Sequence, residues 1–480
     1  MVFSNLLFVF LFLPLNLLCY FLARDIKTKN AVMLAFSLIF YAWGEPLYIL
    51  LLIFMTVADW FLTLKIAESE GIYKRKRLFM ALIVIIDLGL LAVFKYGSFM
   101  LSNLNILTGF PEKIPNIALP IGISFYTFQL LTYCIDVYRG DVPPQKSFPT
   151  LLLYVSMFHQ CIAGPIVRYK DICGELEERH TTYTEIYEGI CRFSTGLFKK
   201  ALLANTCAEL VAKLLVADGG DTSVLAGRSA ISLWFGVLAF SIQIYLDFSA
   251  YSDMAVGMGK MIGIHYTENF DYPYISRSVS EFWRRWHISL GSFFRDYLYI
   301  PLGGNRKGAI RTVLNLFVVW ALTGLWHGAS WNFVLWGIYF FVFIAIEKLF
   351  LNKCLEKSKI VSHIYLIIIV YFGWILFKFE NMADVLSVIK GMFCMNSNPF
   401  SDFESFTIIK SYILFFAFAV ACCTPVFSWI SKKLSEKALS SNGALIGYAF
   451  CNILLPIILV ALSVASLIGS SYNPFLYFRF

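Results

Sequence analysis

One histidine lies in the middle of a long apolar stretch. His327 belongs to "GLWHGASWN" (324–332), and the surrounding residues 313–347 are mostly hydrophobic. An ionisable side chain is costly inside a membrane, so its presence there indicates a functional role. Gly324 and Gly328 would allow another backbone or a substrate to approach the imidazole closely. Because the pKa of an ordinary histidine is about 6.5, His327 could take a proton from a hydroxyl group at neutral pH, as a general base does.

A second cluster of polar residues lies upstream, within residues 265–312. "FWRRWHISL" (282–290) contains another histidine, His287, and "PLGGNRKG" (301–308) is a turn with two cations. Arginine and tryptophan are typical of amphipathic helices at the membrane–water interface. Backbone N–H groups of a glycine turn beside cations could instead bind a phosphate-bearing group. Both interpretations remain open from the residues alone.

The composition is that of a membrane protein. Of 480 residues, 59% are hydrophobic and 15% are charged, whereas about a quarter of the residues in soluble domains are charged. Several apolar runs approach the ~20 residues that a helix needs to cross a bilayer. The alternating pattern of a membrane barrel is absent, and backbone groups in hydrocarbon must pair within their own helix. The sequence therefore predicts an all-α, polytopic transmembrane helical bundle.

Loop charges predict the orientation of this bundle. The net charge is +8, but the basic residues lie in short loops rather than in one stripe, which argues against a nucleic-acid-binding protein. The charges place the N-terminus, the loop 380–404 and the C-terminal tail outside the cytoplasm. Residues 148–225 are ambiguous, and we treat 1–480 as a single membrane-embedded domain. The spans that define this orientation are 1–22, 31–44, 47–66, 79–101, 119–138, 360–379, 405–428 and 441–470.

The remaining chemistry-bearing residues indicate no metal site. The eleven cysteines show no CxxC pairing, and no other spacing suggests metal ligands. Asp247 is a second charge within an apolar stretch, followed by Asp253. These carboxylates could pair with arginines of 277–311 or form part of a proton path. A structural role is favoured, because a buried charge needs a partner.

At these residues the chain resembles the membrane-bound O-acyltransferase family, in particular a bacterial branch with alginate O-acetyltransferase and the D-alanyl transfer protein of teichoic acid modification. "FWRRWHISL" combined with "GLWHGA" is a specific pair of motifs. The resemblance implies a catalytic core at about 119–340, in a ring of helices around a central tunnel and funnel. The matching stretches are 119–140, 162–169, 245–263, 269–308 and 323–337.

The resemblance identifies His327 as the active-site histidine and His287 as the second histidine. Acyl transfer from a thioester needs a hydroxyl nucleophile, a base and hydrogen-bond donors for the oxyanion, which assigns His327 as the base. The other expected substrate- and donor-binding residues fall into three groups. Donors or positioning groups beside the base are Trp326, Ser330 and Asn332; Arg284 and Arg285, together with His287, would position the donor at the tunnel mouth, where Trp283 and Trp286 are further donor-binding residues; and partners for donor phosphates are Arg306 and Lys307.

The donor implied by the resemblance is acetyl-coenzyme A, with no bound cofactor. An acyl-carrier thioester, as in D-alanylation, is the alternative within the same class. A polysaccharide or ion transporter is the alternative from a different class, because intramembrane His and Asp also mark ion paths. We expect a multi-pass protein of the bacterial cytoplasmic (inner) membrane. Its expected partners are the lipid bilayer, an extracytoplasmic acetyltransferase and a polysaccharide acceptor.

The chain ends in an aromatic tail, 471–480, that contains "NPFLYFRF". Tyr477 offers a phenol that a histidine base could activate, because the pKa of a phenol is about 10. The tail resembles the tyrosine-bearing tail of the partner peptide in D-alanylation systems. We predict that Tyr477 carries the acyl group outward. The alternative is an aromatic belt at the outer membrane interface.

Overall fold

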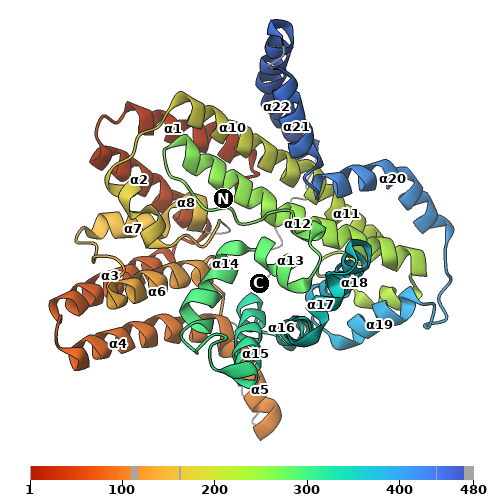
Figure 1. Ribbon diagram of the computed structural model, residues 1–480, viewed down its shortest axis with the longest axis horizontal. Coiled ribbons are helices and arrows are strands. Elements are labelled where there is room, and N and C mark those ends of the chain that lie inside the picture. The colour runs from red at the N-terminus through yellow and green to blue at the C-terminus, as the bar shows by residue number, and fades with distance from the viewer. Residues whose placement is uncertain (1, 110–116, 162–163, 439–440, 470–480) are drawn as a thin grey trace. The chain divides into compact units, whose positions relative to one another are not determined.

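The computed structural model describes residues 2–109, 117–161, 164–438 and 441–469, and these are almost entirely helical (Figure 1). Among them, the β-pairing is an isolated antiparallel bridge between Phe270 and Trp286. The predicted all-α fold is confirmed. The chain divides into two units, Met1–Phe193 with Tyr251–Glu268 (unit 1) and Ser194–Ala250 with Asn269–Phe480 (unit 2). The expectation of one domain over 1–480 stays a prediction.

Unit 1 contains the N-terminal helices and the last part of the long helix α12. Its helices are η1 (Phe8–Phe12), α1 (Leu13–Leu22), α2 (Ile26–Gly44), α3 (Ile49–Glu68), α4 (Tyr73–Leu91), η2 (Ala92–Tyr96), α5 (Gly97–Thr108), α6 (Ile123–Arg139), α7 (Phe148–Ser156), α8 (Phe158–Cys161), α9 (Tyr169–Glu177), the first two thirds of α10 (Tyr183–Phe198) and the end of α12 (Ala230–Met261).

Unit 2 contains the two histidine motifs. Its helices are η3 (Lys199–Ala204), α11 (Asn205–Leu214), η4 (Thr222–Gly227), the first part of α12, η5 (Pro273–Ile275), α13 (Val279–Arg285), α14 (Ile288–Phe294), η6 (Arg295–Tyr299), α15 (Gly308–His327), α16 (Trp331–Ile346), η7 (Glu347–Leu351), α17 (Asn352–Leu355), α18 (Lys359–Lys378), α19 (Met382–Met392), α20 (Phe403–Cys422), α21 (Val426–Ala438) and α22 (Asn442–Gly469).

Eight helices among the described residues are long and apolar enough to cross a membrane. Five of the predicted spans match helices of this set. These helices are Ile49–Glu68, Tyr73–Ile106, Lys359–Lys378, Phe403–Cys422 and Asn442–Gly469. The predicted span 1–22 forms the shorter apolar helix Phe8–Leu22, and the ambiguous region 148–225 forms shorter helices in its described part. The all-helical, multi-pass character is thus confirmed, while the orientation of the spans stays a prediction.

The apolar stretch 313–347 is divided into two helices. Helix α15 ends at His327 and α16 begins at Trp331, so the histidine lies at a helix end rather than within one continuous helix. Gly328 is extended, with φ −168° and ψ 152°, and Ser330, at the N-cap position of α16, is also extended. Because of this break, the chain continues from His327 in an extended conformation instead of a further helical turn.

Candidate active site

His327 is enclosed by aromatic rings. Its side chain is nearly buried, at 5% exposure. The ring centroid lies 4.8 Å from that of Trp326, 5.0 Å from Trp336 and 5.3 Å from Phe377. All three contacts are close to perpendicular, which is a favoured geometry for aromatic pairs. The imidazole is therefore held in one orientation by packing on several sides.

Helices α15 and α16 approach each other unusually closely just before this histidine. A Cβ atom on Gly324 would lie 2.2 Å from the carbonyl oxygen of Phe333, and one on Gly337 would lie 2.3 Å from that of Trp320. No side chain fits at either position without moving a backbone. Gly324, which the sequence analysis associated with a close approach, thus lets the backbone of α16 pack against α15. Gly337 does the same from α16, and the sequence analysis did not identify it.

His287 is held in a strained backbone conformation between α13 and α14. Its φ is +48° and its ψ is +54°, the left-handed region that residues other than glycine rarely adopt. Asn269 secures the following residues, because its backbone carbonyl accepts the N–H of Ile288 and its Oδ1 accepts the N–H and hydroxyl of Ser289. Burial lowers the pKa of His287 to about 3, so the imidazole is neutral at neutral pH.

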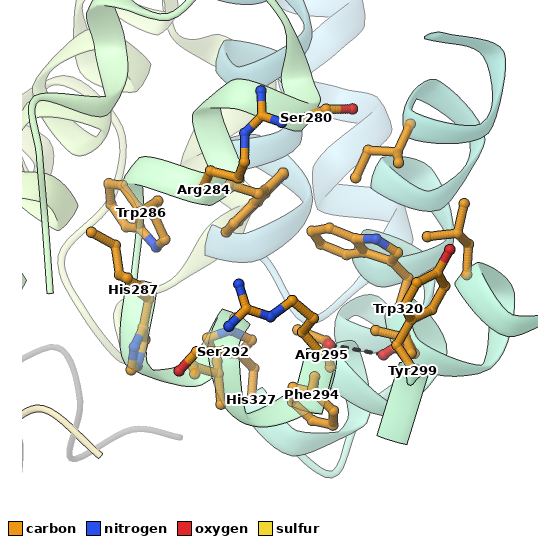
Figure 2. A pocket seen from close by; sticks show the side chains of 18 of the residues that line it. Ser280, Arg284, Trp286, His287, Ser292, Phe294, Arg295, Tyr299, Trp320 and His327 are labelled. Atoms are coloured by element: carbon orange, nitrogen blue, oxygen red, sulfur yellow. Dashed lines mark hydrogen bonds between the residues drawn. The ribbon is translucent and has the colours of Figure 1, made fainter. Parts of the chain in front are cut away.

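The two histidines line one cavity in unit 2. This cavity has a volume of about 430 Å³, and Figure 2 shows His287 and His327 among the side chains of its wall. Trp326 contacts both histidines, with ring centroids 5.8 Å from His287 and 4.8 Å from His327. The cavity also contacts Trp283 and Trp286, two of the residues expected at a donor site. The structure thus brings together the two motifs that lie about forty residues apart in the sequence.

Three cations lie on the wall of the same cavity: Arg284 from α13, Arg295 from η6 and Lys348 from η7 (Figure 2 labels the two arginines). Arg295 pairs with Asp296 at 2.7 Å, and Lys348 donates a hydrogen bond to the Tyr299 hydroxyl. Arg284 was expected at this place, whereas Arg295 and Lys348 were missed. Arg295 is one of many charged residues within 265–312, and Lys348 follows an apolar run, so neither residue type nor position distinguished them in the sequence.

A buried carboxylate positions the helix that carries Trp283 and Arg284. Glu347 has no exposed surface. It accepts the backbone N–H groups of Val279 and Ser280 at 2.6 and 2.9 Å, and the Ser280 hydroxyl at 2.6 Å. The first N–H groups of a helix have no partner within it, and they attract negative charge. Glu347 therefore fixes the start of α13 against η7, a role that its place at the end of an apolar run did not indicate.

The other predicted site residues lie near the cavity but do not line it. Arg285 pairs with Asp271 and Glu281 at 3.0 and 3.1 Å. Asn332 is fully buried and donates from Nδ2 to the carbonyl of Leu376 at 3.3 Å. Trp326, as described above, contacts both histidines.

The remaining predictions are not brought to this wall. Arg306 and Lys307 are exposed in the turn before α15. Ser330 is the residue before α16 and makes no side-chain capping bond. Tyr477 and the tail 471–480 lie outside the described residues. The roles assigned to all the predicted site residues stay predictions.

The two carboxylates that the sequence analysis singled out, Asp247 and Asp253, are each found in an ion pair. Asp247 of α12 pairs with Lys200 of η3 at 2.8 Å, and each side chain is 1% exposed. In unit 1, Asp253 pairs with Arg192 at 2.7 Å. These pairs are consistent with the favoured structural role. Neither Lys200 nor Arg192 lies in 277–311, where the sequence analysis looked for partners.

Comparison with known proteins identifies the family. Residues 145–389 match the model of the membrane-bound O-acyltransferase family. Probable alginate O-acetylase AlgI of Pseudomonas putida is 36% identical over the full length of both chains. Peptidoglycan O-acetyltransferase of Helicobacter pylori is 33% identical, over 82% of this chain and 80% of its own. Teichoic acid D-alanyltransferase of Bacillus subtilis is 27% identical, over 50% of this chain and 61% of its own.

These similarities agree with the multi-pass helical fold and with a cavity lined by both histidine motifs. The family resemblance expected from the sequence is confirmed, and the transporter alternative is set aside. The chain belongs to the membrane-bound O-acyltransferase family and is an O-acyltransferase.

Proposed function

We propose that this protein moves an acetyl group from acetyl-coenzyme A, on the cytoplasmic side, to a hydroxyl group that serves polysaccharide O-acetylation outside the cell. The observation that supports this most directly is the cavity of about 430 Å³ lined by both His287 and His327. It joins the candidate base to cations that suit a phosphate-bearing donor. Of the relatives, those at 33–36% identity that cover most of the chain are named as O-acetylating enzymes.

In this proposal His327 is the general base. It removes the proton of the acceptor hydroxyl as the oxygen attacks the thioester carbonyl, and it then returns the proton to the departing thiolate. The end of a helix concentrates partial negative charge, which stabilises a cation formed there, and His327 is the last residue of α15. The aromatic rings around it exclude water, so the acyl group is protected from hydrolysis until the acceptor arrives.

The neutral imidazole of His287 has a separate role. It cannot attract donor phosphates by charge, because its pKa is about 3. It can still orient the thioester through a hydrogen bond, and its left-handed backbone is held in place by Asn269 and Ser289. Attraction of the phosphates falls to Arg284, Arg295 and Lys348 on the same wall.

The protein's surroundings follow from this reaction. A cytoplasmic donor and an extracellular polymer require a multi-pass protein of the bacterial cytoplasmic membrane, with an extracytoplasmic acetyltransferase as a partner. Tyr477 remains our candidate carrier of the acetyl group between the two. Transfer of D-alanyl from a carrier protein is the second candidate, supported by the similarity to teichoic acid D-alanyltransferase over half of the chain.

The test is His327→Ala in the full-length protein reconstituted in liposomes with labelled acetyl-coenzyme A. We expect release of free thiol to fall by about 10²–10⁴-fold, which is the usual contribution of a general base. His159→Ala is the matched control, because His159 is also buried, at 1% exposure, and packs against Tyr266 and Phe158 in unit 1. Unchanged thiol release by a folded His327→Ala variant would exclude His327 as the base.

A further inference from the structure

Unit 1 contains a cavity that the proposed reaction does not use. Its volume is about 490 Å³, within the ~300–1,000 Å³ that is typical of small-molecule sites. Its wall is formed by the first turns of α2, by residues between 145 and 150 at the start of α7, and by the end of α9. Helices α2 and α7 pack against each other (Figure 1). All residues of this wall belong to unit 1, whereas both candidate histidines belong to unit 2.

Two opposite charges line this cavity, Lys27 of α2 and Glu177 of α9. Both residues are exposed, and neither forms an ion pair with another described residue. The wall thus offers one ammonium group and one carboxylate to a ligand. A ligand that carries charges of both signs can pair with each of them.

Each of these charges lies at the helix end that does not favour it. Lys27 and Lys29 are in the first turn of α2, where the helix dipole favours an anion. Asp25 caps this end by accepting the N–H of Thr28 at 2.9 Å, but one carboxylate stands there against two lysines. Glu177 is the last residue of α9, where the dipole favours a cation. An anionic group beside α2 and a cationic group beside α9 would therefore be stabilised.

A buried guanidinium adds positive charge behind the wall. Arg179 is 8% exposed and donates hydrogen bonds to the Tyr20 hydroxyl at 2.9 Å and to Oδ1 of Asn30, a residue of the wall, at 2.7 Å. It forms no ion pair with a described residue, and its Nη2 has no hydrogen-bond partner among them. A buried cation without a counter-charge is unfavourable. An anion in the cavity would lower that cost, because charges interact strongly where water is excluded.

The rest of the wall is partly polar and partly apolar. Gln145 donates from Nε2 to the Tyr169 hydroxyl at 2.9 Å and accepts the N–H of Ser147 at 2.8 Å, and Thr150 donates to the Ser147 hydroxyl at 2.9 Å. These uncharged groups bond within the protein, so the charges remain for recognition of a ligand. The apolar residues of the wall, which can contact hydrocarbon, are Ile26, Ala31, Leu34, Pro149 and Leu176.

The predicted orientation of the spans places this cavity at the cytoplasmic surface of the membrane. Spans 1–22 and 119–138 both run inward, so the start of α2 and the segment before α7 follow them on the cytoplasmic side. Phospholipids present charged head groups next to apolar chains at this level. A phospholipid therefore matches both the charged and the apolar part of the wall, whereas a soluble anion would match only the charges.

We propose that this cavity binds a phospholipid with a phosphoethanolamine head group, its phosphate towards Lys27 and its ammonium group towards Glu177. A primary ammonium group donates hydrogen bonds to a carboxylate. The choline nitrogen carries methyl groups only and cannot donate, and phosphatidylglycerol has no cationic group to pair with Glu177. Lipid binding at this place is independent of the acyl transfer proposed above.

Retention of matched lipids tests the site. The full-length protein is placed in nanodiscs that contain equal parts of phosphatidylethanolamine, phosphatidylcholine and phosphatidylglycerol with the same acyl chains. It is then extracted into mild detergent, and the retained lipids are counted by native mass spectrometry. We expect about two- to fivefold more phosphatidylethanolamine than either other lipid, which is the usual contribution of an exposed ion pair. Equal retention of the three lipids overturns the proposal.

Soluble head groups distinguish the two possible sources of the phosphate. Phosphoethanolamine and inorganic phosphate are added at millimolar concentration to separate samples before extraction. Neither should displace the phosphatidylethanolamine, because neither contacts the apolar part of the wall. Displacement by either compound would show that the cavity binds a soluble phosphate, and it would overturn the assignment to a lipid.

Charge variants locate the binding. Glu177→Gln should abolish the preference for phosphatidylethanolamine over phosphatidylcholine, and Lys27→Glu should lower the retention of phosphatidylethanolamine itself. The matched controls are Glu178→Gln and Lys74→Glu, since both residues are exposed in unit 1 and neither belongs to the cavity wall. Thermal unfolding in detergent verifies that each variant is folded. Wild-type retention in both cavity variants, or the same losses in the controls, would contradict the proposed site.

Discussion

Two groups of cations in unit 2 look alike in the sequence and differ in the structure. Arg306 and Lys307 lie in a glycine-containing turn, and Arg284, Arg295 and Lys348 come from three separate elements. All five side chains are exposed, so burial does not distinguish the groups. The second group lines the cavity that contains both histidines, and the first does not. We therefore expect donor binding to depend more on the cations that line this cavity than on the cations of the glycine-containing turn.

The largest effect on donor binding is expected at Arg284. Arg284→Glu should raise the KM for acetyl-coenzyme A by about tenfold or more and lower kcat less, because one charge-assisted contact is replaced by a repulsive one. Arg284→Lys keeps the charge on the wall and should retain most of the binding. Steady-state thiol release over a range of donor concentrations gives both constants. If Arg284→Glu leaves the KM for acetyl-coenzyme A unchanged, the cations that line the cavity are no more important for donor binding than those of the turn.

A smaller effect is expected in the turn. The double change Arg306→Glu with Lys307→Glu should raise the KM for the donor by about two- to threefold, since exposed charges off the cavity wall act at longer range and are screened by salt. The increase should fade when the ionic strength is raised. If the turn instead matches Arg284→Glu in magnitude, then the donor phosphates contact Arg306 and Lys307, as the sequence predicts.

The smallest effect concerns pH and His287, the neutral group on the same wall. Burial lowers the pKa of His287 to about 3, below its ordinary value of 6.5. Between these values the unfolded chain binds a proton that the folded chain does not, so stability should fall as the pH is lowered from 6.5 towards 3. Thermal unfolding in detergent should show a weaker pH dependence for His287→Gln. The donor KM of the wild type should not change between pH 6.5 and 8 through this residue.

The sequence was sufficient for the class of fold and for the two histidines. Hydropathy and loop charge depend on local composition, so five spans could be placed within a few residues of their helices. His327 could be identified because a single ionisable group in an apolar stretch stands out. The family motifs then linked His327 to His287, and the structure places both on one cavity wall.

The residues that complete the site could not be found in this way. Glu347 ends an apolar run and looks like an ordinary boundary residue, yet it caps α13 from sixty-eight residues away in the sequence. Phe377 is one of 47 phenylalanines, and its type carries no signal. Gly337 gains meaning only from the carbonyl of Trp320 that faces it. Each role depends on a tertiary contact between distant segments, which neither composition nor spacing reports.

The buried pair of Lys200 and Asp247 bears on how the protein enters the membrane. A carboxylate near the middle of a helix opposes insertion by about 2.5–3.5 kcal/mol. Because Lys200 precedes α12 in the chain, the neutralising ammonium group has already been synthesised when Asp247 leaves the ribosome. We therefore expect α12 to insert more favourably when η3 is present, because the buried pair is then electrically neutral. The cation is thus synthesised before the carboxylate that it neutralises. A fragment beginning after residue 204 would lack Lys200 and leave the charge of Asp247 without this partner.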